Sequence, residues 1–306
     1  MNLIPKNQLE LFEYDKEFIN LINLYENKKF PTKILLSGQK GLGKCTLAYH
    51  LINYILSNDE DFPYDKDNFK ISENNKSYRL IQNGSNPNFD LIDILPDKKN
   101  IDINQIRDLI LKMNKSSFNS KPRFILIDNV ENLNKNSSNA LLKSLEEPNE
   151  NIYFILIKNE KKILPTIESR CLSFKISKSN DEIKKVVHKI FKQNITELLD
   201  PNLFNYYFTP GKIYNLIKFS NENKIDIKSS SMNNFLSNII DKNLYKKDQS
   251  IKTILYEFIE TIIISSSKIT KYKNYNYFIK RINDIRKFNL DEESLFIEFK
   301  SKILNG

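Results

Sequence analysis

Short apolar runs alternate with amphipathic segments over the first part of the chain. Strands that are buried on both faces read as continuous apolar runs, so each run predicts a strand. These runs are Lys33–Ser37, Asn88–Leu95, Arg123–Asp128, Ile152–Ile157 and Leu172–Ile176. Because the strands alternate with helices, we expect an α/β fold over residues 1–176, with a doubly wound, parallel sheet of these five strands.

Apolar residues recur at a helical spacing between the runs. The helical pattern covers residues 8–30, 44–56, 101–113 and 137–147. Proline follows the first of these segments at Pro31 and the last at Pro148, and it ends both helices. Residues 58–76 are acidic, rich in Asn and aperiodic, which predicts an excursion on the surface.

The pattern changes after residue 177, where the strands stop and only helical segments follow. We therefore expect three domains: an α/β P-loop domain at 1–177, a small helical domain at 178–228 and a helical C-terminal domain at 229–306. The Ser-rich stretch Lys228–Ser231 predicts the linker between the last two.

The composition is that of a soluble globular protein, with 40% hydrophobic and 28% charged residues. The net charge of +9 favours an anionic partner such as nucleic acid. Lys, Asn and Ile are abundant throughout, however, and an A/T-rich genome would give the same excess. The two cysteines are too few for a four-cysteine zinc module or a disulfide framework, and they fit a reducing compartment. With no signal segment and no apolar run of roughly 20 residues, we expect a cytoplasmic protein that does not enter a membrane.

A glycine-rich stretch, Gly38–Thr46, follows the first apolar run and precedes a helical pattern. Strand, glycine-rich loop, lysine and helix form the arrangement of a phosphate-binding P-loop. Gly38, Gly41 and Gly43 let the backbone turn its N–H groups inward, and the helix N-terminus adds partial positive charge. Lys44 would reach the outer phosphates of a nucleotide.

The residue after this lysine departs from the P-loop pattern. A P-loop has Ser or Thr there, whose hydroxyl holds Mg²⁺, whereas this chain has Cys45. A thiol is a soft, poor ligand for a hard cation. Thr46 carries a hydroxyl, but it lies one position later, about 100° around the helix. A second interpretation takes Cys45 as a nucleophile or redox sensor, because a helix N-terminus lowers the pKa of a thiol.

The strand that ends at Asp128 resembles a Walker B element, in which the Asp orients Mg²⁺ through water. Enzymes that hydrolyse nucleotides usually have Glu next, to activate the attacking water. This chain has Asn129 there, which cannot accept a proton at neutral pH, and Glu131 lies two positions further on. A plain turn residue at a strand end is the alternative for Asp128. Together with Cys45, Asn129 indicates that hydrolysis within this chain is slow or absent, with no competent base in cis.

Several stretches resemble, in order, those of bacterial clamp-loader subunits of the AAA+ family. They are Gly84–Asp90, the post-Walker B element Asn139–Pro148, the sensor 1 residue Asn159, the Ser-Arg-Cys region Leu164–Cys171, and the sensor 2 region Thr209–Lys212. This resemblance covers residues 8 to about 220. It implies an AAA+ domain with a five-stranded sheet, a helical lid and a helical collar for oligomerisation.

Within this family the chain most resembles the delta-prime type, which has a degenerate nucleotide site. The resemblance implies a stator in a hetero-pentameric ring with gamma/tau and delta subunits, which loads the sliding clamp on primed DNA. Arg170 would then be an arginine finger that acts in trans on the ATP of a neighbouring motor subunit. A structural ion pair is the alternative for Arg170. The degenerate nucleotide site would comprise Gly38, Gly41, Gly43, Lys44, Cys45, Thr46, Asp128, Asn159 and Lys212.

The sequence leaves the cofactors partly open. ATP or ADP could still bind the loop, with Mg²⁺ weak or absent. Relatives carry a four-cysteine zinc module in the region that corresponds to residues 57–88, but this region has no Cys or His, so we expect no zinc. Lys158 stands where relatives have Thr or Ser before the sensor 1 Asn, and Lys212 is equally well explained as a solvated lysine.

Two other functions remain open on the sequence alone. The first is an active ATPase, a motor subunit of the gamma/tau type in the same complex, which would need Mg²⁺ and a base at the site of Cys45 and Asn129. The second is a small-molecule kinase with a P-loop, which the Ser-Arg-Cys region and the helical C-terminal third disfavour. Enzyme activity of the chain alone is therefore uncertain.

Overall fold

The computed structural model describes residues 3–96, 98–114, 119–146, 151–159, 161–200, 208–228, 231–246, 249–265, 269–288 and 290–304. The chain divides into two compact units, Met1–Glu182 and Ile183–Gly306, and the division falls within helix α7 (Asn180–Phe191). Within the ranges above, no helix is both long and apolar enough to span a bilayer.

Five parallel strands form the sheet of the first unit. They are β1 (Lys33–Ser37), β2 (Phe89–Ile92), β3 (Arg123–Ile127), β4 (Ile152–Lys158) and β5 (Leu172–Lys175). Their order across the sheet is β2-β3-β4-β1-β5, and each neighbouring pair runs parallel. This arrangement confirms the predicted α/β fold with a doubly wound, five-stranded parallel sheet.

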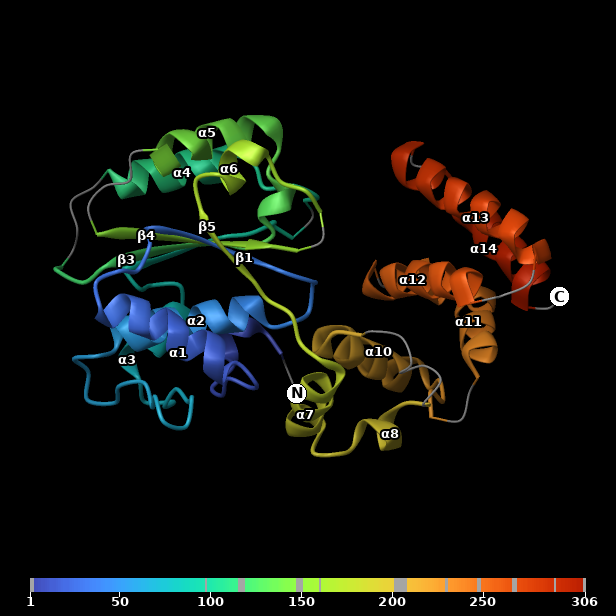
Figure 1. Ribbon diagram of the computed structural model, residues 1–306, viewed down its shortest axis with the longest axis horizontal. Helices are drawn as coiled ribbons and strands as arrows, with labels where there is room; N and C mark the ends of the chain where they lie inside the picture. Colours follow the sequence, from blue (N-terminus) through green and yellow to red (C-terminus); the bar gives the residue numbers. More distant parts are fainter. Residues whose placement is uncertain are drawn as a thin grey trace. The chain divides into compact units, whose positions relative to one another are not determined.

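Helices cover both faces of this sheet (Figure 1). One face carries α1 (Asp15–Glu26), α2 (Lys44–Leu56) and α3 (Lys76–Gln82), and the other carries α4 (Ile103–Met113), α5 (Lys135–Glu146) and α6 (Pro165–Glu168). Successive side chains of a strand point to opposite faces. Ile34 and Leu36 accordingly pack in the cluster with α1 and α2, whereas Leu35 between them packs with α4 and α5. Each such buried side chain stabilises the fold by about 1.5–3 kcal/mol.

The predicted helix over residues 8–30 is wrong at its start, because α1 begins only at Asp15. Residues 9–11 instead pair with residues 69–71. The Leu11 N–H donates to Phe69 O at 3.0 Å, and the Ile71 N–H donates to Leu9 O at 2.8 Å. The apolar residues at positions 9 and 11 fit the period of a strand as well as that of a helix, and the pairing with the distant segment decides between them.

The excursion between α2 and α3 is held by polar side chains. His50 Nδ1 accepts a hydrogen bond from the Tyr64 hydroxyl at 2.9 Å, and its Nε2–H donates to Gln8 O at 3.2 Å. Asn75 accepts from Asn53 at 2.9 Å and caps α3, a helix that the sequence pattern did not predict. Among the described residues, no three His, Cys, Asp or Glu side chains gather as metal ligands; the expected lack of zinc stays a prediction.

Helices are the regular secondary structure of the second unit, whose described residues contain no strand. After α7 come α8 (Ile195–Leu198), α10 (Pro210–Asn223), α11 (Met232–Asp241), α12 (Gln249–Ser265), α13 (Ile269–Phe288) and α14 (Glu293–Phe299). One hydrophobic cluster joins residues on either side of position 228, and the rings of Phe208 and Phe258 meet at 5.3 Å. The division into lid and collar at that position stays a prediction. Pro148 and the linker residues 229 and 230 lie outside the described residues.

Candidate functional site: a P-loop with altered metal and base positions

The strand order creates a switch point at the carboxyl ends of β1 and β4. These strands are neighbours, but the chain leaves β1 through α2 on one face and reaches β4 from α5 on the other. In open α/β sheets, ligands bind outside the carboxyl ends of the strands at such a point. The loop after β1 and the residue after β4 meet there, since Lys44 Nζ lies 2.9 Å from Asn159 Oδ1.

The backbone of the loop after β1 requires glycine at specific positions. Gly41 and Gly43 have φ angles of 87° and 94°, in the left-handed region that glycine tolerates. Gly38 lies against the backbone of Ile176, and a Cβ at position 38 would overlap the Ile176 carbonyl oxygen. Gly43 caps α2, so the loop leads directly into a helix N-terminus, as a phosphate-binding loop requires.

The ammonium group of Lys44 binds the loop from which it comes. Its Nζ donates to Gly38 O at 2.8 Å, to Gln39 O at 2.7 Å and to Asn159 Oδ1 at 2.9 Å, and the residue is only 3% exposed. These bonds engage the N–H donors of the ammonium. In this arrangement Lys44 stabilises the conformation of the loop, and a phosphate would have to replace some of these contacts.

A chain of amide hydrogen bonds crosses the ends of the central strands. Asn159 Nδ2 donates to Asn129 Oδ1 at 3.0 Å, and Asn129 Nδ2 donates to Asp93 Oδ1 at 2.8 Å. Asn129 has a left-handed backbone, with φ of 53°, a conformation in which Asn is enriched. Both Nδ2 and Oδ1 of Asn129 are therefore hydrogen-bonded, so that this side chain links Asp93 to Asn159. Position 129 is the one at which enzymes that hydrolyse nucleotides usually have Glu.

Cys45 and Asp128 lie near each other at the expected Mg²⁺ position. The Asp128 carboxylate accepts a hydrogen bond from the Asn129 N–H at 2.8 Å. Burial, and then the nearby charge of Asp93, raises the pKa of Asp128. Burial, followed by the charge of Asp128, raises the pKa of the Cys45 thiol well above its usual value. The raised pKa disfavours the thiolate, which speaks against the interpretation of Cys45 as an activated nucleophile or redox sensor.

These residues do not suit a magnesium ion. Mg²⁺ needs hard oxygen ligands in near-octahedral geometry, whereas the side chain at position 45 is a thiol whose raised pKa disfavours the charged form. Thr46 follows Cys45 on α2, about 100° further around the helix. The loop backbone and Lys44 are the groups that could hold phosphate, whereas position 45 lacks the hydroxyl ligand for Mg²⁺ and the Asn129 amide is not basic.

Asp93 is a site residue that the sequence interpretation missed, and Glu131 is one that it set aside because it lies two positions after Asn129. Asp93 follows β2 as Asp128 follows β3, and the same signal, an apolar strand that ends in Asp, could have found it. It was missed because the predicted strand ran on to Leu95. Glu131 Oε2 accepts from the Asn159 N–H at 3.2 Å, so its carboxylate lies beside the sensor 1 residue. No sequence signal places it there.

Arg170 lies just after α6 and takes part in an ion pair within the first unit. Its Nη2 donates to Glu146 Oε1 at 2.5 Å, and its Nη1 donates to Thr166 O at 2.9 Å. The ion pair that the sequence left open is thus present. Its side chains are 33% and 51% exposed, and such pairs contribute only about 0–1 kcal/mol to stability. The guanidinium therefore remains available to a stronger anion.

Lys212 belongs to the second unit. It lies at the start of α10, where Thr209 caps the helix, and its Nζ pairs with Glu257 of α12 at 2.9 Å. The side chains of this pair are 16% and 29% exposed, so Lys212 is not a fully solvated lysine. It contributes a contact between two helices of its own unit.

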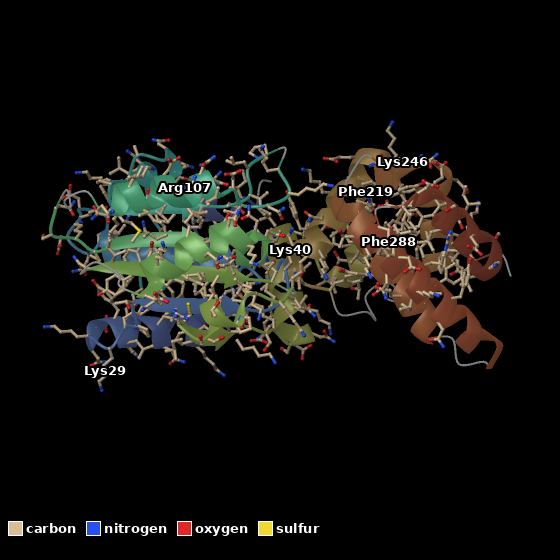
Figure 2. All side chains as sticks on the ribbon, turned by 90° about the horizontal axis from the view of Figure 1, so that it is seen from above. Lys29, Lys40, Arg107, Phe219, Lys246 and Phe288 are labelled. Atoms are coloured by element: carbon tan, nitrogen blue, oxygen red, sulfur yellow. The ribbon has the colours of Figure 1, made fainter. Side chains whose placement is uncertain are left out.

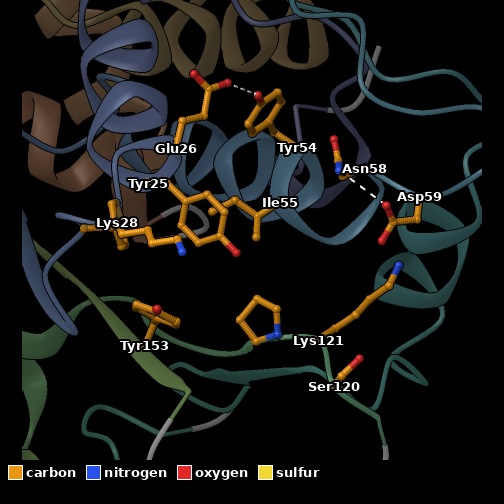
Figure 3. Close-up of a pocket in the computed structure, with 12 residues that line it drawn as sticks. Tyr25, Glu26, Lys28, Tyr54, Ile55, Asn58, Asp59, Ser120, Lys121 and Tyr153 are labelled. Carbon is orange, nitrogen blue, oxygen red and sulfur yellow. Dashed lines mark hydrogen bonds between the residues drawn. The ribbon is translucent and has the colours of Figure 1, made fainter.

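Two hollows of the first unit lie apart from these residues. A pocket of about 700 Å³ at the amino ends of the strands is lined by aromatic residues, among them Tyr25, Phe30 and Tyr153 (Figure 3). A groove of about 480 Å³ between α4 and α5 is lined in part by Lys143 and by Arg107, which is labelled in Figure 2. Neither contains a residue that the sequence assigns to the nucleotide site.

A family model described as "DNA polymerase III, delta subunit" matches residues 14–180, more than half of the chain. The match spans the P-loop, Asp128 and Arg170. The chain belongs to this family of clamp-loader subunits. The resemblance that the sequence motifs indicate is therefore confirmed at the level of the family.

Curated relatives of this clamp-loader subunit include both delta' and gamma/tau subunits of DNA polymerase III. DNA polymerase III subunit delta' of Buchnera aphidicola is 26% identical over 88% of this chain and 84% of its own length. DNA polymerase III subunit gamma/tau of Mycoplasma genitalium is 27% identical over 86% of this chain, but only 43% of its own length. A solved structure of a gamma subunit-related protein from Thermotoga maritima covers 93% of this chain and 98% of its own, with a TM-score of 0.56 and 18% identity, which supports the fold.

Proposed function

We propose that this chain is a delta-prime-type subunit of the DNA polymerase III clamp loader, with a degenerate nucleotide site. In this proposal it is a cytoplasmic stator of a hetero-pentameric ring with gamma/tau and delta subunits, which loads the sliding clamp on primed DNA. The observation that carries the proposal is Cys45 in the first turn of α2, directly after the P-loop lysine, where a thiol replaces the hydroxyl ligand for Mg²⁺. Asn129, bound to Asp93 and Asn159, supports it, because it leaves the site without a base.

The catalytic contribution in this proposal comes from Arg170 and acts on a neighbour. Arg170 is 33% exposed after a short helix, where its guanidinium can reach beyond the surface of its own unit. A guanidinium placed against the γ-phosphate of ATP in an adjacent motor subunit would stabilise the charge that develops during phosphoryl transfer. ATP or ADP binding to this chain itself, with Mg²⁺ weak or absent, is part of the same proposal.

The test uses the reconstituted complex and the isolated chain. The isolated chain should hydrolyse almost no ATP, whereas the complex should. Arg170→Ala should lower ATP turnover by the complex strongly, since an arginine finger contributes about 10³–10⁵ in turnover. Unchanged turnover by this variant complex would refute the role in trans.

The second candidate is an active motor subunit of the gamma/tau type. The observation in its favour is the preserved loop, with Gly41 and Gly43 in left-handed conformations and Lys44 as the first residue of α2. The similarity to a gamma/tau subunit over 86% of this chain supports it as well. ATP turnover by the isolated chain at about 1 per second or faster would favour it.

A further inference from the structure

Both terminal nitrogens of Arg170 are held by the chain itself. Nη1 donates to the Thr166 carbonyl of α6, and Nη2 donates to Glu146, the last residue of α5. Two contacts, one on each nitrogen, fix the plane of the guanidinium as well as its position. Donors remain on the guanidinium for an external anion, because each terminal nitrogen carries a second N–H.

The backbone next to Glu146 is hydrogen-bonded to a residue of the sheet. The carbonyl of Leu145, the residue before it, accepts a hydrogen bond from Lys33 Nζ at 2.7 Å. Lys33 is the first residue of β1, and Leu145 is fully buried against α4 and the sheet. The end of α5 is therefore fastened to the start of a central strand, and the carboxylate that holds Arg170 projects from a rigid support.

We propose that Glu146 is a positioning residue for Arg170. The inference rests on the proposed role of Arg170 in trans and names the residue that orients it. A long arginine side chain loses rotamer freedom when it is fixed on a target. Glu146 fixes it before the neighbouring subunit arrives, so that less freedom is lost on contact with the phosphates. Preorganised donors of this kind are what stabilises charge in a transition state.

ATP turnover by the reconstituted complex tests this role. Glu146→Ala should lower kcat by about two- to fivefold, the range that follows from the strength of an exposed ion pair. Glu146→Gln keeps an acceptor oxygen in the same place and should retain most of the wild-type kcat. Glu10→Ala is the matched control, because it removes a carboxylate of similar exposure, 44%, that pairs with Lys70 rather than with Arg170 and lies outside the named motifs. This control should leave kcat unchanged.

The Arg170→Ala background separates positioning from a general effect on structure. There, Glu146→Ala should cause no further loss of turnover. A wild-type or increased kcat for Glu146→Ala with Arg170 present, or an equal loss in both backgrounds, would overturn the positioning role. If instead Arg170→Ala itself leaves turnover unchanged, the proposed function fails and not only this inference. Thermal unfolding of each variant subunit, expected to match the wild type, excludes loss of the fold as the cause.

Discussion

The substitution Lys44→Met tests whether Lys44 stabilises the loop or binds phosphate. The Lys44 ammonium donates to Gly38 O, Gln39 O and Asn159 Oδ1, and the residue is 3% exposed. Each lost bond is worth about 1 kcal/mol net. The three bonds together therefore predict a loss of about 2–3 kcal/mol in the free energy of unfolding. For a unit of this size, we expect the melting temperature to fall by about 5–10 °C.

Thermal and urea unfolding of the full chain, followed by circular dichroism, measures this loss. The control is Lys29→Met, an exposed lysine between α1 and β1 whose replacement should change stability by less than about 0.5 kcal/mol. ATP turnover by the reconstituted complex should be unchanged in Lys44→Met under conditions where the variant is folded. A Lys44→Met chain with wild-type stability, in a complex that has lost its turnover, would refute the structural role.

Three further predictions concern individual side chains. Burial and the charge of Asp93 raise the pKa of Asp128, so its protonated form contributes stability that is lost as pH rises through the folded pKa. The variant Asp128→Asn should therefore be more stable than the wild type at pH 7–8, and this difference should shrink below about pH 4. Unfolding measured as a function of pH tests this prediction. Burial lowers the pKa of His50 to about 4, so stability should be lost as pH falls from about 6.5 to 4, by up to about 3 kcal/mol, and His50→Gln should flatten this dependence. Cys45→Ser should raise Mg²⁺-dependent ADP affinity by about tenfold or more, measured by calorimetry with and without Mg²⁺, since even outer-shell partners change metal affinity by about 10- to 100-fold.

The sheet and the P-loop could be predicted because their signals are local. An apolar run such as the one that becomes β3 reads as a buried strand without knowledge of its neighbours, and Gly41 and Gly43 mark a left-handed loop. The start of α1 could not be predicted, because residues 9–11 pair with residues 69–71, and a periodic pattern does not encode such a distant partner. Helix α3 could not be predicted for a similar reason. Its N-cap residue Asn75 is held by a hydrogen bond from Asn53 of α2, a contact that the local sequence does not encode.

The candidate site shows the same limit. The residue types at positions 44, 45 and 128 could be interpreted from the motif alone. The engagement of Asn129 by Asp93 and Asn159 depends on three strand ends that meet in space. The pairing of Arg170 with Glu146 likewise joins residues from different elements, and the sequence offered an ion pair only as a general alternative.

The place of β1 in the sheet has a consequence for synthesis and for fragments of the chain. Both of its partners come much later, because β4 begins at Ile152 and β5 at Leu172. A nascent chain that ends before residue 150 therefore leaves β1 without a hydrogen-bonded neighbour on either side. The P-loop can complete its contacts only after residue 176 has been synthesised, since Gly38 packs against Ile176. Contacts so distant along the chain are slow to form, so the loop should take its shape among the last parts of the first unit.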